Sequence, residues 1–384
     1  PYTLKKACAN LPTGRNKTHH AGRTEKTKVT YCEKCDVVPE IAPTNGTLYL
    51  WPPVAHTTGK ILAGAKAIDI NVKKTPSVAT LSCPYSRPGL RALIDAISID
   101  LLPEELADTK ALIMPGTDTP EIDDISRITS LGAIRAAIGG EWLGELLRES
   151  RLNSVFQPIF SCKNLNMPYA HECLIRGAAP DGSVINPVQL FEAAQSATLL
   201  FQLDRAARAA NVRNAMKAGV QGNLFINFTP SSIYDPDSCL RSTIEVVEEC
   251  NVDRKNVVFE VIETEKVRST AHLSAILESY RASGFRVALD DVGSGYSTLN
   301  LLPELRPDII KIDRELIDHV DQDKFKEAIV SKLIALAKQL DIEVVAEGIE
   351  RQEELDFLMA HDVDYVQGFL LGRPTPAPFK GPAV

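Results

Sequence analysis

Short apolar runs alternate with helix-forming segments from residue 151 to the end of the chain at residue 384, and this alternation limits the fold more than any other feature. The runs predicted to be strands are VFQPIF, HECLIRG, LFINFTP, VVFEVIE, RVALDDV, DIIKID, EVVAEGI and YVQGFLL. Eight strands with intervening helices in a segment of this size are typical of a TIM-like (β/α)8 barrel. The sequence therefore predicts such a barrel for residues 151–384.

A second pattern precedes the barrel, in residues 48–122. The predicted strands and helices are, in order, TLYLWPP, AHTTGKILAGAKA, IDINV, SVATLSC, RPGLRALIDAIS and KALIMPG. Their order, βαββαβ, indicates a small ferredoxin-like α+β domain. Residues 123–150 are mostly helix-forming, and we expect them to link this domain to the barrel. The small domain could be a sensor, a dimerisation surface or a docking unit for a partner protein, since fold alone does not decide between these roles.

The composition is that of a globular protein, with 44% hydrophobic and 24% charged residues. The net charge of −8 gives no reason to expect DNA binding, which usually leaves a basic footprint. No apolar run approaches the roughly 18 residues of a membrane span, and the first residues lack the apolar core of a signal peptide. Several cysteines stand within apolar runs, as buried free thiols do in a reducing compartment. We therefore expect a cytoplasmic protein.

The first 47 residues form a basic segment that contains a CxxC motif. Cys32 and Cys35, together with Cys8 and His19 or His20, could supply a tetrahedral Zn²⁺ site. Alternatively, the two cysteines of the motif are free thiols or a redox pair. The sequence leaves both interpretations open.

Polar side chains follow nearly every predicted barrel strand, at the point where the strand ends. They are Glu172, Asn227, Glu260, Asp290 with Asp291, Lys311, Glu347 and Gln367. A single charge at a strand end is often only solvated, but here seven strands share the pattern. In a barrel these positions meet at the C-terminal mouth, where active sites lie. Carboxylates around one cavity repel each other unless cations neutralise them, and all-oxygen ligation suits Mg²⁺ or Mn²⁺. The pattern predicts a hydrolase with paired divalent metal ions.

These residues and the motifs around them resemble the EAL domain, the bacterial phosphodiesterase domain that opens the cyclic dinucleotide c-di-GMP to linear pGpG. The resemblance runs from about residue 152 to residue 374. Its motifs are FQPI, ECLIR, INFTP, FEVIETE, LDDVGSGYSTL, IIKID, VAEGIE and DYVQGFLLGRP. Each motif alone is a weak pattern, but their order and spacing together are highly specific.

The resemblance implies a role for each of these residues. The first metal ion would be held by Glu172, Asn227, Glu260 and Asp290, and Asp291 would contribute to a second. Lys311 and Gln367 would orient water and the metal shell, and Glu347 would act as a general base or orient one. Glu263 would brace the loop after Asp291, unless it is simply solvated. Substrate contacts would fall on Gln157, Leu174, Arg176, Gln367 and Arg373, the last of which could equally be a surface residue.

The chain departs from the family pattern at three positions. Cys173 replaces the alanine of the signature tripeptide, and it should point away from the Glu172 face because alternate strand residues face opposite ways. Val292 and Ser294 stand where the family usually has Phe and Thr. The resemblance also implies a homodimer, formed through a helix and loop near DDVGSG.

The activity that follows is metal-dependent hydrolysis of c-di-GMP to linear pGpG, regulated by the N-terminal domain. One alternative is a catalytically weak or inactive c-di-GMP receptor that signals to a partner protein. A third class is an unrelated barrel lyase that uses Lys311 as a base.

Overall fold

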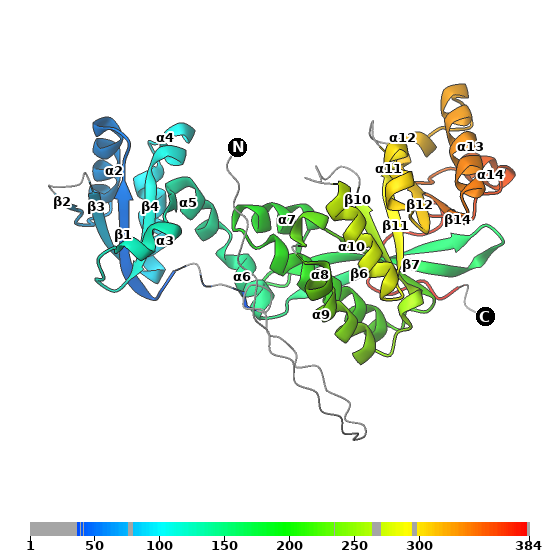
Figure 1. Ribbon diagram of the computed structural model, residues 1–384, viewed down its shortest axis with the longest axis horizontal. Helices are drawn as coiled ribbons and strands as arrows, with labels where there is room; N and C mark the ends of the chain where they lie inside the picture. The colour runs from blue at the N-terminus through cyan, green and yellow to red at the C-terminus, as the bar shows by residue number, and fades with distance from the viewer. Residues whose placement is uncertain are drawn as a thin grey trace, which may run out of the picture.

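The structure, a computed structural model, describes residues 37–38, 40, 42–75, 80–233, 235–262, 270–293 and 298–381. It has a small α+β lobe, followed by a barrel lobe that contains the C-terminal half of the chain (Figure 1). The candidate zinc ligands Cys8, His19, Cys32 and Cys35 lie outside the described residues.

The small lobe is built on one antiparallel sheet. Its strands are β1 (Asn45–Trp51), β2 (Lys73–Thr75), β3 (Thr80–Ser86), β4 (Lys110–Pro115) and β5 (Thr129–Ser130). Its helices include α2 (Ala55–Ala67), α3 (Arg87–Ser98) and α4 (Pro103–Asp108). The strand order β2-β3-β1-β4-β5 places the first strand in the centre, as the ferredoxin-like arrangement requires. Leu48 and Leu50 of β1 pack with Ile61 of α2 and Leu93 of α3 to form the core of this lobe.

The strand predicted at IDINV is wrong: the second strand begins only at Lys73. The residues in question are used to end α2 instead. The backbone N–H groups of Ile68 and Ile70 both donate to the carbonyl oxygen of Ala65, and Asp69 adopts a left-handed φ of 59°. This is how a helix C-terminus reverses the chain, so the strand forms a few residues later.

Residues 122–148 divide between the two lobes. They form a 3-10 turn (Ile122–Arg127), β5, α5 (Leu131–Gly139) and α6 (Glu141–Arg148). Leu131 and Ile134 of α5 belong to the core of the small lobe, whereas Leu143 and Leu146 of α6 pack against helices of the barrel lobe. The transition therefore falls at Gly140, where an added Cβ would lie 2.6 Å from that of Ala197.

The barrel closes through eight of the described strands, each at a predicted position. They are β6 (Leu152–Ser161), β7 (Asn164–Ala178), β9 (Asn223–Phe228), β10 (Val257–Ile262), β11 (Arg286–Val292), β12 (Ile309–Ile312), β13 (Glu343–Ala346) and β14 (Tyr365–Val366). The short strand β8 (Val184–Ile185) pairs with β7 outside the closed ring. The covering helices are α7 (Pro187–Ser196), α8 (Leu200–Ala218), α9 (Pro236–Glu249), α10 (Thr270–Ala282), α11 (Thr298–Leu305), α12 (Arg314–Ile317), α13 (Lys324–Gln339) and α14 (Gln352–Ala360). The TIM-like barrel is confirmed.

The first barrel strand differs from a regular (β/α)8 barrel, because β6 runs antiparallel to both of its neighbours, β7 and β14. Only Cys162 and Lys163 separate β6 from β7. Parallel pairing needs a crossover of a dozen or more residues, so a connection this short can only form a hairpin. The other seven described strands are parallel, and their carboxyl ends meet at one rim.

The opposite end of the barrel is closed by aromatic and charged side chains at the strand starts. The rings of Tyr169 and Tyr365 stack with centroids 4.0 Å apart. Arg286 pairs with the Glu343 carboxylate and donates to the Tyr169 hydroxyl at 2.8 Å, and the Tyr365 hydroxyl donates to Glu343 at 3.1 Å. Each charge at this end therefore has a partner of opposite sign or a hydrogen bond.

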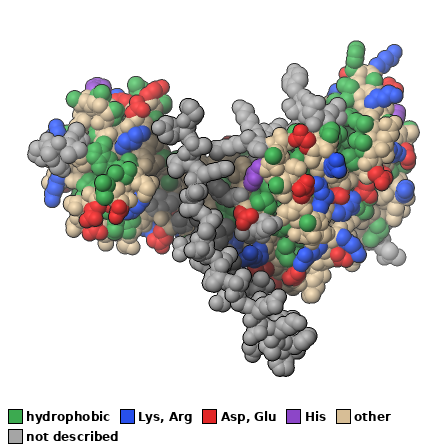
Figure 2. Space-filling model, viewed as in Figure 1, with side chains coloured by type: hydrophobic (Ala, Val, Ile, Leu, Met, Phe, Trp, Pro, Cys, Tyr) green, Lys and Arg blue, Asp and Glu red, His purple; other side chains and the backbone are tan. Residues whose placement is uncertain are grey.

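Within the part of the chain that the structure describes, none of the helices has the length and apolar character needed to span a bilayer. On the face shown in Figure 2, Lys and Arg side chains are intermixed with Asp and Glu over the barrel lobe.

Candidate active site

Lys311, on β12, lies at the centre of a ring of carboxylates at the mouth of the barrel. Its Nζ atom is 2.5 Å from Glu260 Oε1, 2.5 Å from Glu347 Oε1 and 3.1 Å from Asp290 Oδ1. Glu172 Oε2 is farther away, at 3.8 Å. These side chains come from five different strands or strand ends, so the barrel is what brings them together.

Two amides hold the Glu172 carboxylate in place. Asn227 Nδ2 donates to Glu172 Oε1 at 3.2 Å, and Gln367 Nε2 donates to Glu172 Oε2 at 2.8 Å. Asn227 lies on β9 beside β7, and Gln367 directly follows β14. Both amide groups thus point into the ring, where the sequence pattern predicts them.

A bulge in β11 brings two consecutive aspartates to the same site. In a regular strand Asp290 and Asp291 would face opposite sides of the sheet. The pairing of β11 with β12 shifts between Leu289 and Val292, and Asp291 takes a left-handed φ of 56°. One carboxylate oxygen from each aspartate then lies within 4.8 Å of one from Glu347, a spacing that suits a cation.

The ionised form of the acids in the ring is destabilised, because the acids are buried and close to each other. Burial raises the pKa of Glu260 and of Asp290, although Lys311 opposes both shifts. Burial also raises the pKa of Glu347 to about 8 and that of Asp291 to about 6, with neighbouring carboxylates adding to both effects. Burial alone would lower the pKa of Lys311, but the surrounding carboxylates outweigh it and raise that pKa well above its usual value.

Some oxygens of the ring lack hydrogen-bond donors. Among the described residues, neither Glu260 Oε2 nor Gln367 Oε1 has a hydrogen-bond partner, although both side chains are buried. Such atoms are costly to bury without a partner, and they have lone pairs free to coordinate a cation. Lys311 lies within 4 Å of four carboxylates and Asp291 adds a fifth, so the ring carries an excess of acidic groups. The ring therefore fits oxygen-seeking divalent cations.

A cavity of about 210 Å³ opens beside the ring and contains residues that the sequence pattern did not single out. Four of the candidate site residues, Gln157, Glu172, Glu347 and Gln367, line it together with Arg314, Gly348, Glu350, Gly368 and Phe369. Arg314 and Glu350 pair at 3.0 Å. Arg314 follows Lys311 by three residues, and Glu350 follows Glu347 by three. Their closeness to the strand ends is the feature of the sequence that could have identified them as residues of this cavity.

The position of the Arg314 side chain also accounts for the glycine at position 348, where φ is 71°. A Cβ atom at Gly348 would lie 2.4 Å from Arg314 Cγ, so the arginine stem packs directly on the backbone there. The glycine thus serves both a left-handed turn and a close contact.

The remaining predicted substrate contacts are spread around the mouth. Gln157 Nε2 donates to the Gly372 carbonyl oxygen at 3.3 Å. Leu174 and Arg176 continue the Glu172 face of β7, but Arg176 lines a separate cavity of about 480 Å³. Arg373 is exposed and lies over the Phe369 ring, 4.1 Å from its centroid.

Cys173 is buried on the outer side of the barrel wall, as predicted, among residues such as Phe156 and Ile226. Val292 is also buried in that outer layer. Glu263 and Ser294 lie outside the described residues.

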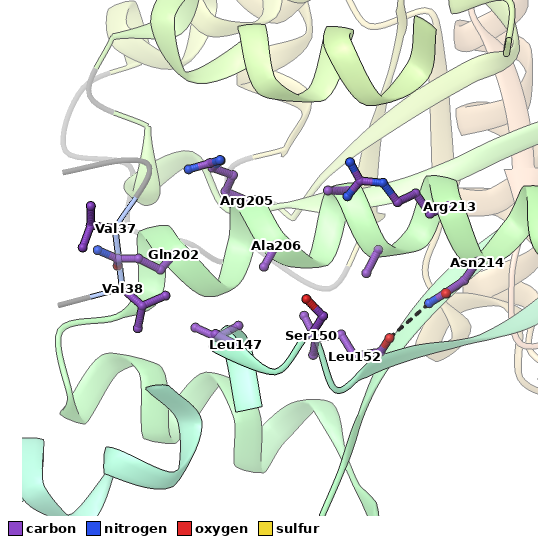
Figure 3. A pocket seen from close by; sticks show the side chains of 12 residues that line it. Val37, Val38, Leu147, Ser150, Leu152, Gln202, Arg205, Ala206, Arg213 and Asn214 are labelled. Atoms are coloured by element: carbon purple, nitrogen blue, oxygen red, sulfur yellow. Dashed lines mark hydrogen bonds between the residues drawn. The ribbon is translucent and has the colours of Figure 1, made fainter. Parts of the chain in front are cut away.

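A different cavity, of about 410 Å³, lies along α8 and is separate from the ring (Figure 3). Val37, Val38 and Leu147 line one side of it, and Arg205 and Arg213 of α8 line another. Its described lining contains no carboxylate, so it does not share the chemistry of the barrel mouth.

A closed barrel with a ring of carboxylates and one lysine at the carboxyl ends of its strands has the architecture of a TIM-barrel enzyme, in which the active site lies at that end. The family model described as the EAL domain matches residues 141–374. The chain belongs to the EAL domain family.

Two curated relatives illustrate the match. The chain is 32% identical over 219 residues to the bifunctional diguanylate cyclase/cyclic di-GMP phosphodiesterase MucR of Pseudomonas aeruginosa, covering 54% of this chain and 30% of the relative. It is 30% identical over 247 residues to the probable cyclic di-GMP phosphodiesterase PdeG of Escherichia coli, covering 62% of this chain and 48% of the relative. The chain thus spans less than half of the length of these two relatives.

Solved structures agree with the fold. A standalone EAL protein from Vibrio cholerae in its c-di-GMP-bound form is 31% identical, with a TM-score of 0.53, and the match covers 58% of this chain and 92% of that one. The phosphodiesterase of MucR, in a complex with c-di-GMP, is 28% identical with a TM-score of 0.55, over 62% of this chain and 97% of that one.

Proposed function

We propose that this chain is a metal-dependent phosphodiesterase that hydrolyses c-di-GMP to linear pGpG. The observation that carries the proposal is the complete ring of oxygen ligands around Lys311, at the positions where the EAL motifs place it. Relatives named as cyclic di-GMP phosphodiesterases, and structures with c-di-GMP bound, support the choice of substrate.

The residues present fit two divalent cations, Mg²⁺ or Mn²⁺. Glu172, Asn227, Glu260 and Asp290 would hold the first, since the unpartnered Glu260 Oε2 faces no other donor among the described residues. Asp291 would hold the second, with Glu347 close by. Bound cations would lower the pKa of the attacking water and stabilise negative charge on the phosphate oxygens.

The chain's own side chains then supply positioning and proton transfer. Lys311 holds the carboxylates of Glu260 and Glu347 together against their mutual repulsion. Burial raises the pKa of Glu347 to about 8, so this acid is mostly protonated at neutral pH in the metal-free chain. Bound cations would favour its ionised form, which could then accept a proton from the attacking water. Gln367 fixes the orientation of Glu172. Gln157, Leu174, Arg176 and Arg373 would contact c-di-GMP, with Arg176 suited to a phosphate.

The test is to incubate the purified chain with c-di-GMP and Mg²⁺ or Mn²⁺ and to follow the nucleotides by chromatography. We expect linear pGpG as the product. Binding of c-di-GMP without product under any metal condition would instead identify a receptor. If the chain neither binds c-di-GMP nor forms a product from it, both assignments are contradicted.

We further propose that the small lobe regulates the barrel, directly or through a partner protein. A truncation that tests this should begin at Glu141, because Leu143 and Leu146 of α6 are part of the barrel-lobe core. Turnover that differs between the truncated and full chains would support direct regulation, and equal turnover in the presence and absence of the small lobe would contradict it.

A homodimer is also proposed. The resemblance places its contact at the helix and loop near DDVGSG, and α13 presents an exposed apolar surface that could extend that contact. Phe325 and Ile329 are 83% and 47% exposed, and they lie one helical turn apart. Analytical ultracentrifugation of the Phe325→Asp variant tests the proposal, with a dimer expected for the original chain and a monomer for the variant. A cytoplasmic location is proposed from the free thiols of Cys83 and Cys173.

A further inference from the structure

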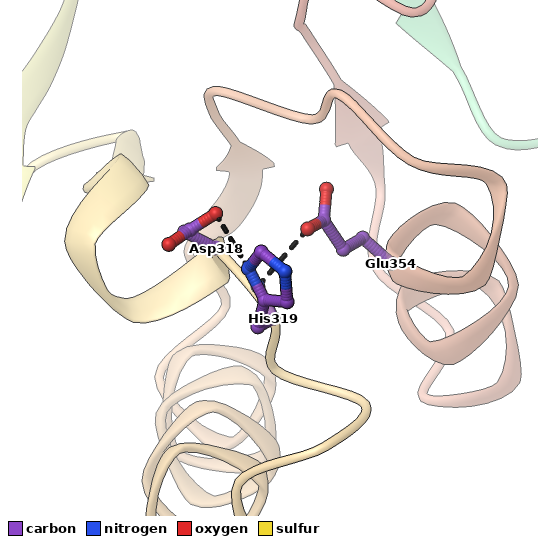
Figure 4. Close-up of side chains that lie close together, drawn as sticks. All are labelled: Asp318, His319 and Glu354. Atoms are coloured by element: carbon purple, nitrogen blue, oxygen red, sulfur yellow. Dashed lines mark hydrogen bonds and ion pairs between the residues drawn. The ribbon is translucent and has the colours of Figure 1, made fainter.

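Glu354, a buried carboxylate outside the ring, joins two loops that follow barrel strands. It lies in the first turn of α14 and is 1% exposed. Its Oε2 atom accepts hydrogen bonds from the backbone N–H groups of Glu350 at 3.0 Å and Arg351 at 3.1 Å. Its Oε1 atom accepts one from the backbone N–H of His319 at 3.0 Å (Figure 4). One side chain thus holds three backbone groups.

Both loops lead directly to the ring. Glu350 and Arg351 end the loop that begins at Glu347, only three residues earlier. His319 follows α12, the short helix after Lys311 and β12. The two strands therefore deliver Lys311 and Glu347 to one point at the mouth, where they meet at 2.5 Å. Glu354 ties the segments behind them together on the outer side.

The cluster of Asp318, His319 and Glu354 has the spacing of a metal site, with one ligand atom of each within 4.8 Å of the others. The hydrogen bonds within this cluster indicate a structural role instead. Both Glu354 oxygens already accept backbone N–H groups, and Asp318 Oδ1 lies 2.9 Å from His319 Nδ1. The geometry is that of a joint between two loops.

We propose that Glu354 is a positioning residue, which fixes Glu347 beside Asp290 and Asp291 by holding the backbone of Glu350 and Arg351. The inference rests on the proposed function, because it assigns Glu354 a part in the metal site of that reaction. Outer groups that orient metal-site residues typically change metal affinity or activity 10- to 100-fold when they are replaced.

Glu354→Gln is the informative substitution, since it preserves volume while replacing one acceptor oxygen with an N–H donor. A glutamine cannot accept hydrogen bonds on both sides, so either the His319 contact or the Glu350 and Arg351 contacts must be lost. Glu353→Gln is the matched control. Glu353 is the neighbouring acid in α14, is exposed, and pairs only with the Arg351 side chain among the described residues, at 3.1 Å.

The first measurement is Mn²⁺ binding to the full chain without nucleotide, by isothermal titration calorimetry. Glu354→Gln is expected to weaken the binding about tenfold, whereas Glu353→Gln leaves it unchanged. The second measurement is steady-state hydrolysis of c-di-GMP at saturating Mn²⁺. Here kcat should fall about 10- to 100-fold with KM changed less than about threefold, because Glu347 is misplaced while the substrate surface is preserved.

Thermal unfolding separates these effects from a loss of structure. If Glu354→Gln does not fold, Glu354→Asp replaces it, since it retains the charge but draws the carboxylate back by one methylene. The three backbone hydrogen bonds that Glu354 accepts form a clamp between the two loops. The Mn²⁺ affinity of Glu354→Asp should lie below that of the original chain and above that of a variant that makes none of these three hydrogen bonds. Equal Mn²⁺ affinity and equal kcat in the Glu354 and Glu353 variants would overturn the proposal. If the original chain hydrolyses no c-di-GMP, the proposed function fails while the Mn²⁺ comparison still tests the clamp.

Discussion

The two ends of the barrel use similar residue types in opposite ways. At the closed end, Arg286, Glu343 and two tyrosines form a network in which each charged group has a partner. At the mouth, the carboxylates outnumber the one lysine among the described residues, and Glu260 is fully buried with an unpartnered oxygen. The same eight strands carry both arrangements.

The difference separates an end whose charges are compensated from an end whose charges are not. A paired network of half-buried charges adds little net stability, yet it does not oppose folding. A buried cluster of like charges does oppose folding, and such clusters are concentrated at functional sites. The contrast therefore locates the active site from the described contacts alone, independently of the family match.

The largest effects are expected at the proposed metal ligands. Replacing Glu172 by Gln or Asp290 by Asn should lower kcat for c-di-GMP by about 10³-fold or more, because each removes a charged side chain from the proposed metal site. In the metal-free protein Asp290→Asn should raise the melting temperature, since burial disfavours the Asp290 charge. Glu172→Gln should lower it slightly, because a glutamine cannot accept hydrogen bonds from both Asn227 and Gln367. Kinetics and thermal unfolding in a chelator check both parts, and a loss of metal-free stability in Asp290→Asn would show that the ring is structural.

The pH dependence of stability should differ between metal-free and metal-loaded protein. The folded-state pKa of Glu347 is about 8 and that of Asp291 about 6, both raised by burial, so the folded protein binds more protons than the unfolded chain at intermediate pH. Their contribution to stability is fully present below about pH 4 and is lost as the pH rises towards 8. Saturating Mn²⁺ should remove this loss, because a cation favours the ionised carboxylates.

Melting temperatures measured from pH 5 to 8, with and without Mn²⁺, test this expectation. The stabilisation by Mn²⁺ should grow steadily with pH, and it should grow less in Glu347→Gln. A stabilisation independent of pH would mean that no acid in the ring has a raised pKa.

A substitution at the closed end should have the opposite effect to one in the ring: it should lower the stability and leave the activity nearly unchanged. Arg286→Met removes the partner of Glu343 and one hydrogen bond of Tyr169, and the expected loss is about 1 kcal/mol of unfolding free energy, kept small by solvent screening. Because the network is remote from Lys311, kcat should stay within about twofold. Urea unfolding measures the change in unfolding free energy, and steady-state kinetics of the same preparation measures the change in kcat. A large fall in kcat would mean that the two ends are coupled.

Much of the barrel and its ring follows from the sequence, because apolar runs that end in acids are a local signal. The eight strands and the gathering of Glu172, Glu260 and Lys311 at one rim needed only periodicity and the rule for strand ends. The number of strands says nothing about their direction, so the predicted barrel did not include the reversal of β6; the local signal for it is the two-residue connection to β7.

The remaining features depend on backbone geometry that local pattern does not encode. The bulge at Asp291 decides that two adjacent aspartates share one site, and it appears only in the pairing of β11 with β12. The clamp by Glu354 joins loops 35 residues apart, and in the sequence Glu354 looks like any other acid in the first turn of a helix. The cap that displaced β2 likewise depends on a left-handed residue, Asp69.

The smallest expected effect concerns the departure from the family signature at Cys173. Its side chain is buried in the outer layer of the wall, on the side away from Glu172, and burial raises the pKa of its thiol far above neutrality. Cys173→Ala, which restores the family residue, should therefore leave kcat and KM within about twofold. The unfolding free energy should fall by about 1 kcal/mol, for the loss of one buried sulfur atom from a packed site. If Cys173→Ala reduced turnover as strongly as Glu172→Gln, the two faces of β7 could not be separated as the structure separates them.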